Sequence, residues 1–192
     1  MYKVIFSLSS YLKFQAYIDQ KDTEISGLGK TSINKENKSI YISDLITLPQ
    51  TATGVNTVFN VGDFLEDTIT KGLEPSDYKL WWHSHVNMPV FWSGTDLATM
   101  EDFDTEFKEN NWILSIVGNK RKEILCRLDL FEPFRITFDK LPWEIDFNCE
   151  MNNEISKLVE EEIKKNFIED IKLNIDWDEL HKIYQRGLPL EV

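Results

Sequence analysis

The spacing of hydrophobic and polar positions predicts a chain in which strands and helices alternate. Short apolar or alternating runs favour strands, whereas apolar residues that recur every three or four positions favour helices. By these criteria, strands are expected over residues 2–8, 23–33, 39–48, 77–85, 111–117, 123–131 and 133–139. Helices are expected over residues 9–20, 61–73 and 93–110. The segment 49–60 favours neither class.

Several of these elements carry additional signals. Ser9 or Ser10 is suited to cap the first helix, because a serine oxygen accepts a hydrogen bond from a free N–H group of the first turn. Polar turns at residues 34–38 and 118–122 predict two hairpins. The helix over 93–110 should bury one side, which carries Leu97, Met100, Phe103 and Phe107. The last strand alternates as a half-buried strand does, with Phe134, Ile136 and Phe138 on one face.

The pattern changes after Asp139. Residues 155–171 place apolar side chains near helical spacing with many charges between them, and residues 175–188 predict a second helix. We therefore expect an α/β (α+β) core domain over residues 1–138, with a mixed central sheet flanked by helices. A helical C-terminal extension is expected over residues 139–192. It either serves as a docking or dimer helix or covers an apolar face of the core.

The composition indicates a folded protein without a membrane or nucleic-acid surface. Hydrophobic residues make up 42% of the chain, which is enough for a core. No apolar run approaches the roughly 18 residues of a membrane span, and the N-terminus lacks the features of a signal peptide. The net charge of −12 argues against the basic clusters that nucleic acid requires. It fits a soluble protein, or one with a basic partner.

The two cysteines, Cys126 and Cys149, belong to no CxxC pair. We expect them to be ordinary thiols in a reducing compartment, which favours a cytoplasmic protein. Cys126 falls within a predicted strand and is expected in the core. His181 has no partner motif and is expected at the surface.

The candidate chemistry is concentrated between Trp81 and Asp96, in the stretch WWHSHVNMPVFWSGTD. His83 and His85 are two residues apart on a predicted strand, so both side chains project from the same face. Two such rings can reach one metal ion at about 2.0 to 2.1 Å. Asp96 follows in the first turn of the next helix and is the candidate third ligand. In the competing interpretation, Ser93 and Asp96 form a capping box, which leaves the paired histidines unexplained.

A metal held in this way would suit catalysis. Three protein ligands leave one position of a tetrahedral zinc ion open, and water bound there has its pKa lowered to about 7. Such a site also needs a base that takes the proton of this water and a donor that faces the oxyanion. The residues thus predict one Zn²⁺ per chain, bound by His83, His85 and Asp96.

These residues resemble the signature of the JAMM (MPN-type) zinc metalloproteases, in which H-S-H is followed after seven residues by S-x-x-D. That family also carries a glutamate on a Gly-bearing strand after the first helix, and residues 24–29, EISGLG, match it in pattern and place. The resemblance covers residues 1–138 and implies a prokaryotic-type member with a cytidine-deaminase-like MPN fold. It implies that His83, His85 and Asp96 bind zinc, that Glu24 is the general base and acid, and that Ser93 hydrogen-bonds the oxyanion.

The resemblance also implies a substrate class. The family hydrolyses amide bonds, often the isopeptide bond that joins the C-terminus of a ubiquitin-like protein to a lysine, so a protein or peptide substrate is expected. The small residues 25–29 leave room for an extended tail, such as one ending in Gly-Gly, beside a strand edge. One departure is Val86, where many members have proline; this position shapes the loop and does not hold the metal.

Other interpretations stay open for several side chains. Trp81 either forms a wall of the site or packs in the core, and the same alternatives apply to Phe91 and Trp92. Glu24 in isolation would be an exposed acid on an edge strand, and Glu36, in a polar turn, is a poor substitute for it.

Two other functions also remain open. In the first, the chain is a non-catalytic MPN-type scaffold or protein-interaction module. In the second, it is a zinc amidohydrolase acting on a small amide or a modified nucleotide. RadC-like proteins share part of the H-x-H…D pattern. No membrane or nucleic-acid partner is expected, and the sequence leaves the oligomeric state and the physiological substrate undetermined.

Overall fold

One curled, eight-stranded mixed sheet organises the part of the chain that the computed structural model describes, which comprises residues 1–47, 52–53, 56–57, 74–106, 112–147, 157 and 161. In spatial order its strands are β10 (Trp143–Asp146), β1 (Lys3–Ser7), β3 (Ser39–Thr47), β2 (Ser26–Asn34), β6 (Leu80–Ser84), β7 (Trp112–Gly118), β8 (Ile124–Leu130) and β9 (Ile136–Phe138). β1 pairs in parallel with β10 and β3, and β6 with β7; the other pairs are antiparallel. The predicted mixed α and β architecture is confirmed.

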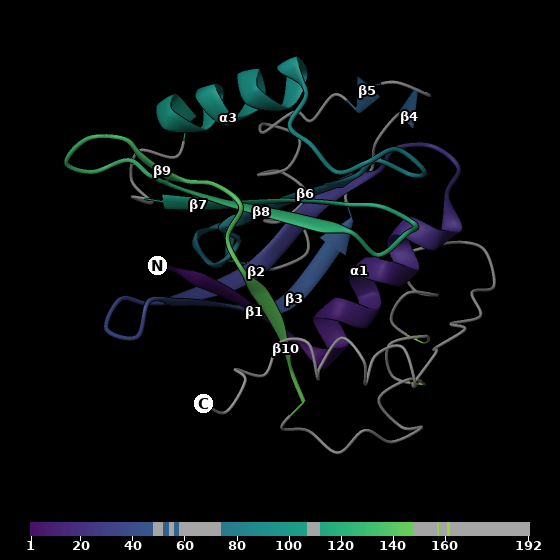
Figure 1. The fold of residues 1–192 in the computed structure, drawn as a ribbon, viewed down its shortest axis with the longest axis horizontal. Helices are drawn as coiled ribbons and strands as arrows, with labels where there is room; N and C mark the ends of the chain where they lie inside the picture. Colours follow the sequence, from purple (N-terminus) through teal and green to yellow (C-terminus); the bar gives the residue numbers. More distant parts are fainter. Residues whose placement is uncertain are drawn as a thin grey trace, which may run out of the picture.

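Two helices lie on opposite faces of this sheet (Figure 1). α1 (Leu8–Gln20) covers one face and α3 (Gly94–Glu106) the other. A short 3₁₀ helix, η1 (Pro75–Asp77), precedes β6, and a separate two-stranded ribbon is formed by β4 (Ala52–Thr53) and β5 (Asn56–Thr57). The expected helix over 61–73 and most of the expected C-terminal helices lie outside the described residues.

The strand β6 divides its side chains between the two layers. Trp82 points toward α1, where its indole stacks on Tyr17 with ring centroids 5.5 Å apart and meets Phe14 edge-on. Trp81 points toward α3 and belongs to a smaller core cluster with Met100 and Phe103. Because successive side chains of a strand alternate between faces, His83 lies on the α3 side with Trp81.

The sheet continues past residue 138, where the core domain was expected to end. Leu141 N–H donates to the carbonyl of Cys126, and β10 then pairs in parallel with β1, from Val4 opposite Trp143 to Ser7 opposite Asp146. The Trp143 ring packs against Phe6 and Tyr11. The segment 139–147 is therefore part of the same sheet, and Cys126 lies buried in its core as expected.

Helix α1 begins two or three residues earlier than expected from its capping signals. Ser7, and not Ser9 or Ser10, is the N-cap, and its Oγ accepts a hydrogen bond from Ser10 N–H at 3.1 Å. Ser10 is fully buried, and its hydroxyl lies within hydrogen-bonding distance of the carbonyls of Ser7 and Ile42. The earlier start brings Leu8, 1% exposed, into the core.

Two expected apolar faces differ from the structure. In α3 the buried stripe contains Asp96, Met100 and Phe103, the i, i+4, i+7 positions of one helix face. Leu97 is one residue away from this stripe and 40% exposed, while Phe107 lies outside the described residues. β9 is an edge strand of three residues, in which Phe138 is partly buried and Ile136 is exposed; Phe134 precedes the strand and is also exposed.

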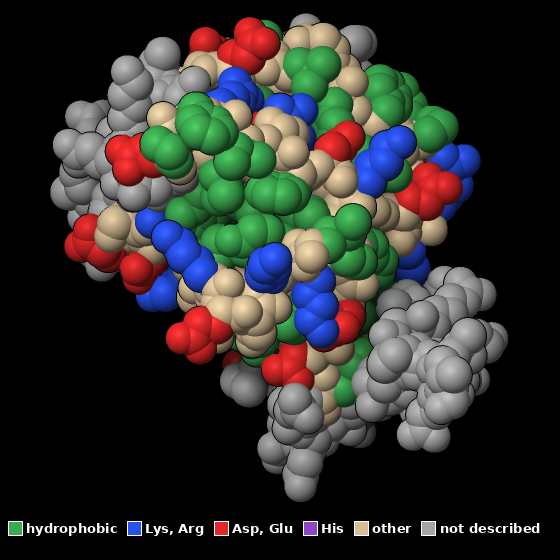
Figure 2. All heavy atoms as spheres, turned by 60° about the vertical axis from the view of Figure 1, so that its left-hand side comes forward, with side chains coloured by type: hydrophobic (Ala, Val, Ile, Leu, Met, Phe, Trp, Pro, Cys, Tyr) green, Lys and Arg blue, Asp and Glu red, His purple; other side chains and the backbone are tan. Residues whose placement is uncertain are grey.

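Surface charge is unevenly distributed despite the acidic total. Figure 2 views the end of the molecule that carries β9 and the N-terminus, and there hydrophobic side chains form a continuous area bordered by several Lys and Arg side chains. Tyr2 and Phe138 lie at this end, with their rings 5.4 Å apart. The net charge of −12 therefore does not describe this face, where basic side chains border an apolar area.

The glycines of β2 serve internal packing and do not leave room for a substrate tail. β2 is a central strand, paired with β3 on one side and β6 on the other, so residues 26–29 offer no free edge. A Cβ at Gly27 would lie 2.8 Å from the Trp82 ring and overlap the Ile46 carbonyl, and one at Gly29 would meet Leu80 and Leu45. The expectation that an extended peptide lies beside these residues is therefore wrong, and Glu24 is not on an edge strand.

We predict that Gly27→Ala destabilises the fold by about 1–3 kcal/mol or more. The added methyl group would meet a backbone carbonyl and the rigid Trp82 ring, which cannot move aside as a flexible side chain would. Gly94→Ala is the matched control, since no atom lies within 4 Å of a Cβ there. Urea denaturation of both variants gives the comparison. Equal stability of the two variants would contradict the packing of β2 against Trp82.

Candidate metal centre

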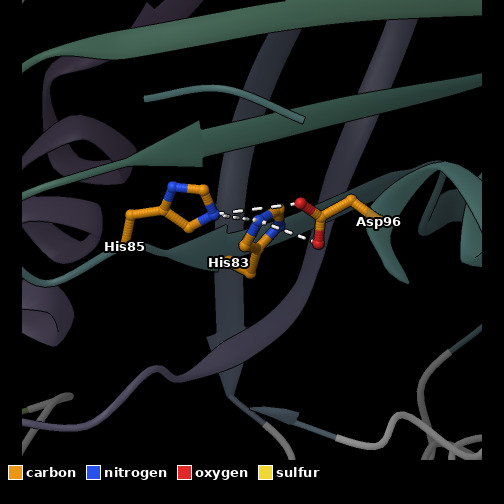
Figure 3. A group of neighbouring side chains, drawn as sticks. All are labelled: His83, His85 and Asp96. Carbon is orange, nitrogen blue, oxygen red and sulfur yellow. Dashed lines mark hydrogen bonds and ion pairs between the residues drawn. The ribbon is translucent and has the colours of Figure 1, made fainter. Parts of the chain in front are cut away.

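Three side chains predicted to bind a metal come together on the α3 side of the sheet (Figure 3). His83 is the fourth residue of β6, His85 follows that strand, and Asp96 is in the first turn of α3. The intervening loop returns the chain over the end of β6, so all three side chains point toward one another. They are 5%, 3% and 8% exposed, respectively.

The distances within this group match the requirements of a small metal ion. The two histidine Nε2 atoms are 3.3 Å apart, and His83 Nε2 is 3.3 Å from Asp96 Oδ1. His85 Nε2 is 3.8 Å from Asp96 Oδ2. Bonds of about 2.0–2.1 Å in tetrahedral geometry separate two ligand atoms by about 3.3–3.4 Å. The three residues could therefore hold one ion with little rearrangement.

The capping interpretation and the metal interpretation are both compatible with the structure. Asp96 Oδ2 accepts a hydrogen bond from Ser93 N–H at 2.7 Å, and Ser93 Oγ accepts one from Asp96 N–H at 3.2 Å. This reciprocal pair is the capping box predicted from the sequence. The other carboxylate oxygen, Oδ1, remains directed at His83. One side chain thus starts the helix and faces the histidines at the same time.

The orientation of each imidazole has a separate cause. His85 Nδ1 lies 3.0 Å from the carbonyl of Pro89, which can only accept, so Nδ1 carries a proton and Nε2 is the nitrogen that faces the group. The His83 ring is stacked on Trp81, with centroids 4.7 Å apart and planes 26° apart. Trp81 therefore lines the site and belongs to the core. Phe91, 46% exposed, meets the His85 ring edge-on at 4.8 Å.

Electrostatics of the metal-free group favour a charged pair. Burial would raise the pKa of Asp96, but the close contacts with His83 and His85 outweigh it and hold that pKa well below its usual range. Burial likewise acts to lower the pKa of His85, but the contacts with Asp96 and Pro89 and the charge of Glu24 raise it overall. The carboxylate is therefore ionised at neutral pH, as a metal ligand must be.

Glu24 lies next to this group, just before β2 and not within it. Ser26 is the register partner of His83, and Ile25 is joined to Ser84 by two hydrogen bonds, so Glu24 comes opposite His85 at the strand end. Its side chain is half-buried, and burial raises the pKa of Glu24 although the positive charges of His85 and His83 oppose this. It is outside the set of three close ligand atoms.

The loop between the histidines and α3 departs from helical and strand geometry at its first residue. Val86 has φ of 47°, a left-handed conformation that costs a β-branched residue about 1–3 kcal/mol. Proline, locked near −65°, cannot adopt it. Val86 therefore gives the loop a path that a proline at this position would prevent.

Two features of the site could not be found from the sequence pattern. The acceptor for His85 Nδ1 is a backbone carbonyl, which any residue at position 89 would carry. The indole of Trp92 donates to Asp139, a residue 47 positions away. Of the other candidates, Glu36 is exposed in the β2–β3 turn, while His181 and Cys149 lie outside the described residues.

Comparisons with known proteins add no assignment to this geometry. No family model matches the sequence, and a search of curated proteins finds no match. Over the described residues, no helix has the length and apolar character needed to cross a membrane.

We predict that Asp96→Asn lowers the stability of the metal-free protein most between about pH 4 and pH 6.5, the ordinary pKa values of Asp and His. Asparagine retains the cap but loses the charge. A lowered carboxyl pKa stabilises the fold above the pKa of the unfolded chain, and this contribution is lost as the pH falls. The raised pKa of His85 has the opposite pH dependence: it stabilises the fold below the pKa of the unfolded chain, and this stabilisation is lost as the pH rises.

Urea titrations of the wild type and Asp96→Asn with a chelator present, from pH 3 to pH 8, measure the difference in their unfolding free energies. A difference in unfolding free energy that is independent of pH would show that the Asp96 carboxylate is not paired with the histidines.

Proposed function

We propose that this chain is a zinc-dependent metalloprotease that hydrolyses a peptide or isopeptide bond. The observation that carries the proposal is the convergence of two imidazole nitrogens and one carboxylate at the spacing of a tetrahedral ion. Nitrogen ligands favour zinc over magnesium or calcium, which prefer oxygen. Three protein ligands are typical of catalytic zinc sites, whereas structural sites use four.

When bound, zinc would act as a Lewis acid and lower the pKa of water at the site to about 7. The residues of the chain would bind the ion and keep its ligands in position. His83, His85 and Asp96 would hold the ion, and the Pro89 carbonyl and the Ser93 N–H group keep His85 and Asp96 in place. This arrangement requires no rearrangement of the cap.

Glu24 is the proposed general base and acid. It lies opposite His85, and its half-buried carboxyl has a pKa raised above that of an exposed glutamate. A base works best when its pKa lies near the working pH, so this shift favours proton transfer at neutral pH. Glu24 accepts a proton from the attacking water and then delivers it to the leaving amine.

Ser93 is the proposed donor to the oxyanion. Its Oγ accepts the hydrogen bond from Asp96 N–H, which leaves the hydroxyl proton free to be donated to the substrate oxyanion. A hydroxyl both donates and accepts, so the capping role and the catalytic role use different capacities of the same atom. Such donors typically contribute a factor of about 10²–10³ to kcat.

The surroundings of the site favour a peptide substrate over a small polar amide. Met88 and Phe91, on the loop that follows the histidines, are each 46% exposed, and Leu97, next to Asp96, is 40% exposed. Large exposed apolar side chains beside a site favour an apolar partner. A ubiquitin-like C-terminus is one such substrate, and this choice is proposed from the resemblance to the JAMM family.

We predict that the purified chain binds one zinc ion and that a chelator removes both zinc and hydrolysis of a peptide or ubiquitin-like conjugate. Added zinc should restore activity. Elemental analysis and a cleavage assay test this. Uptake of iron in place of zinc would contradict the proposal, because two histidines and a carboxylate also suit non-haem iron.

Glu24→Gln should reduce hydrolysis by at least about 10²–10⁴-fold while zinc binding is retained, because the amide cannot accept the proton. Glu36→Gln, in the exposed turn between β2 and β3, is the matched control and should be fully active. Steady-state rates at equal zinc content give the comparison. A Glu24→Gln protein with wild-type activity would remove Glu24 from the mechanism.

A further inference from the structure

Asn119 connects the turn between β7 and β8 with the loop that carries the metal site. Its side chain is fully buried directly after β7. Its Oδ1 accepts hydrogen bonds from the N–H groups of Arg121 and Glu123, and its Nδ2 donates to the carbonyl of Met88 at 2.8 Å and to the Glu123 carboxylate. Both amide protons and both lone pairs are used, which fixes the orientation of the carboxamide.

This turn holds the strained loop at two points. Lys120 N–H donates to the carbonyl of Val86 at 2.7 Å, and Asn119 holds the carbonyl of Met88 two residues later. Val86 is the residue with the left-handed backbone, φ 47°. A strained conformation persists only where neighbouring structure over-determines it, and these two hydrogen bonds come from outside the loop.

The loop conformation in turn decides which nitrogen of His85 faces the other ligands. The residue after Met88 is Pro89, whose carbonyl lies 3.0 Å from His85 Nδ1. A fixed Met88 carbonyl therefore restricts where the Pro89 carbonyl can lie. With the Nδ1 proton engaged, the Nε2 lone pair remains available for the ion.

We propose that Asn119 is a positioning residue for the metal site, which holds Met88 so that the Pro89 carbonyl selects the Nδ1–H tautomer of His85. The inference rests on the proposed metal-binding function of His85, but the contact chain from Asn119 to His85 exists without the ion. Asn119 contacts neither the ligands nor a substrate in this chain of hydrogen bonds.

The alternative is that Asn119 only closes its own turn, and a near-isosteric variant separates the two roles. In Asn119→Asp the carboxylate still accepts from Arg121 and Glu123 N–H groups, so the turn is retained. The amide that donated to Met88 is replaced by an oxygen, which repels that carbonyl. Because the new charge also faces the Glu123 carboxylate, the variant Asn119→Asp/Glu123→Gln removes this second repulsion.

Zinc affinity, measured by competition with a chromophoric chelator, is the first readout. We expect about 10- to 100-fold weaker binding for both variants that carry Asn119→Asp, the effect typical of losing the hydrogen bond that orients a metal-binding histidine. Glu123→Gln alone leaves the Met88 contact intact and should bind zinc like the wild type. Unfolding midpoints of the metal-free proteins establish that the variants are folded. Wild-type affinity in the folded double variant would overturn the proposal.

The second readout requires no metal. The ¹⁵N chemical shifts of the His85 ring, recorded on the metal-free protein at a pH where the ring is neutral, distinguish the two tautomers. We expect Nδ1–H in the wild type and in Glu123→Gln, and a mixture in both Asn119→Asp variants. Unchanged shifts in those variants would overturn the role of Asn119. If the wild type binds no zinc, the metalloprotease proposal fails, and the tautomer still decides the role of Asn119.

Discussion

The pairing of β6 with β2 and β7 is the constraint on which the rest of the structure depends. It fixes the two faces of one short strand, so that Trp82 anchors α1 while Trp81 and His83 face α3. A shift of this register by one residue would exchange the faces. It would bury a histidine in the larger core and expose Trp82 at the site. The same pairing brings Glu24 to the end of the strand opposite His85.

The first turn of α3 shows how one carboxylate serves folding and chemistry together. Asp96 lies on the buried helix stripe with Met100 and Phe103, so packing of the helix against the sheet places its side chain over the histidines. A helix N-terminus favours negative charge, and the Ser93 N–H group binds one carboxylate oxygen. The energetic penalty of a buried charge is thereby offset before any ion is present.

The strands and side chains around the site limit where a peptide substrate could contact the protein. Since β2 has neighbours on both sides, a peptide cannot extend the sheet at residues 26–29, and the glycines there accommodate Trp82 and Leu80. The exposed apolar side chains Met88, Phe91 and Leu97 offer the nearest alternative contact surface. Substrate recognition in this proposal therefore depends on the loop after His85, whose path Val86 and the β7–β8 turn determine.

The sequence by itself determined most elements and the residues of the candidate centre. Strict alternation placed His83 and His85 on one face, and the S-x-x-D spacing predicted the cap, because both are local consequences of strand and helix periodicity. Leu97 and Phe134 were expected to be buried but are exposed, because amphipathic spacing does not indicate how much of a helix or strand face is covered by neighbouring elements. The membership of β10 in the sheet was likewise invisible, since pairing with β1 joins residues more than a hundred positions apart. Only the tertiary structure decided that β2 is central, that Val86 is left-handed, and that Pro89 and Asn119 orient His85, because these depend on backbone groups and distant contacts that residue identity does not encode.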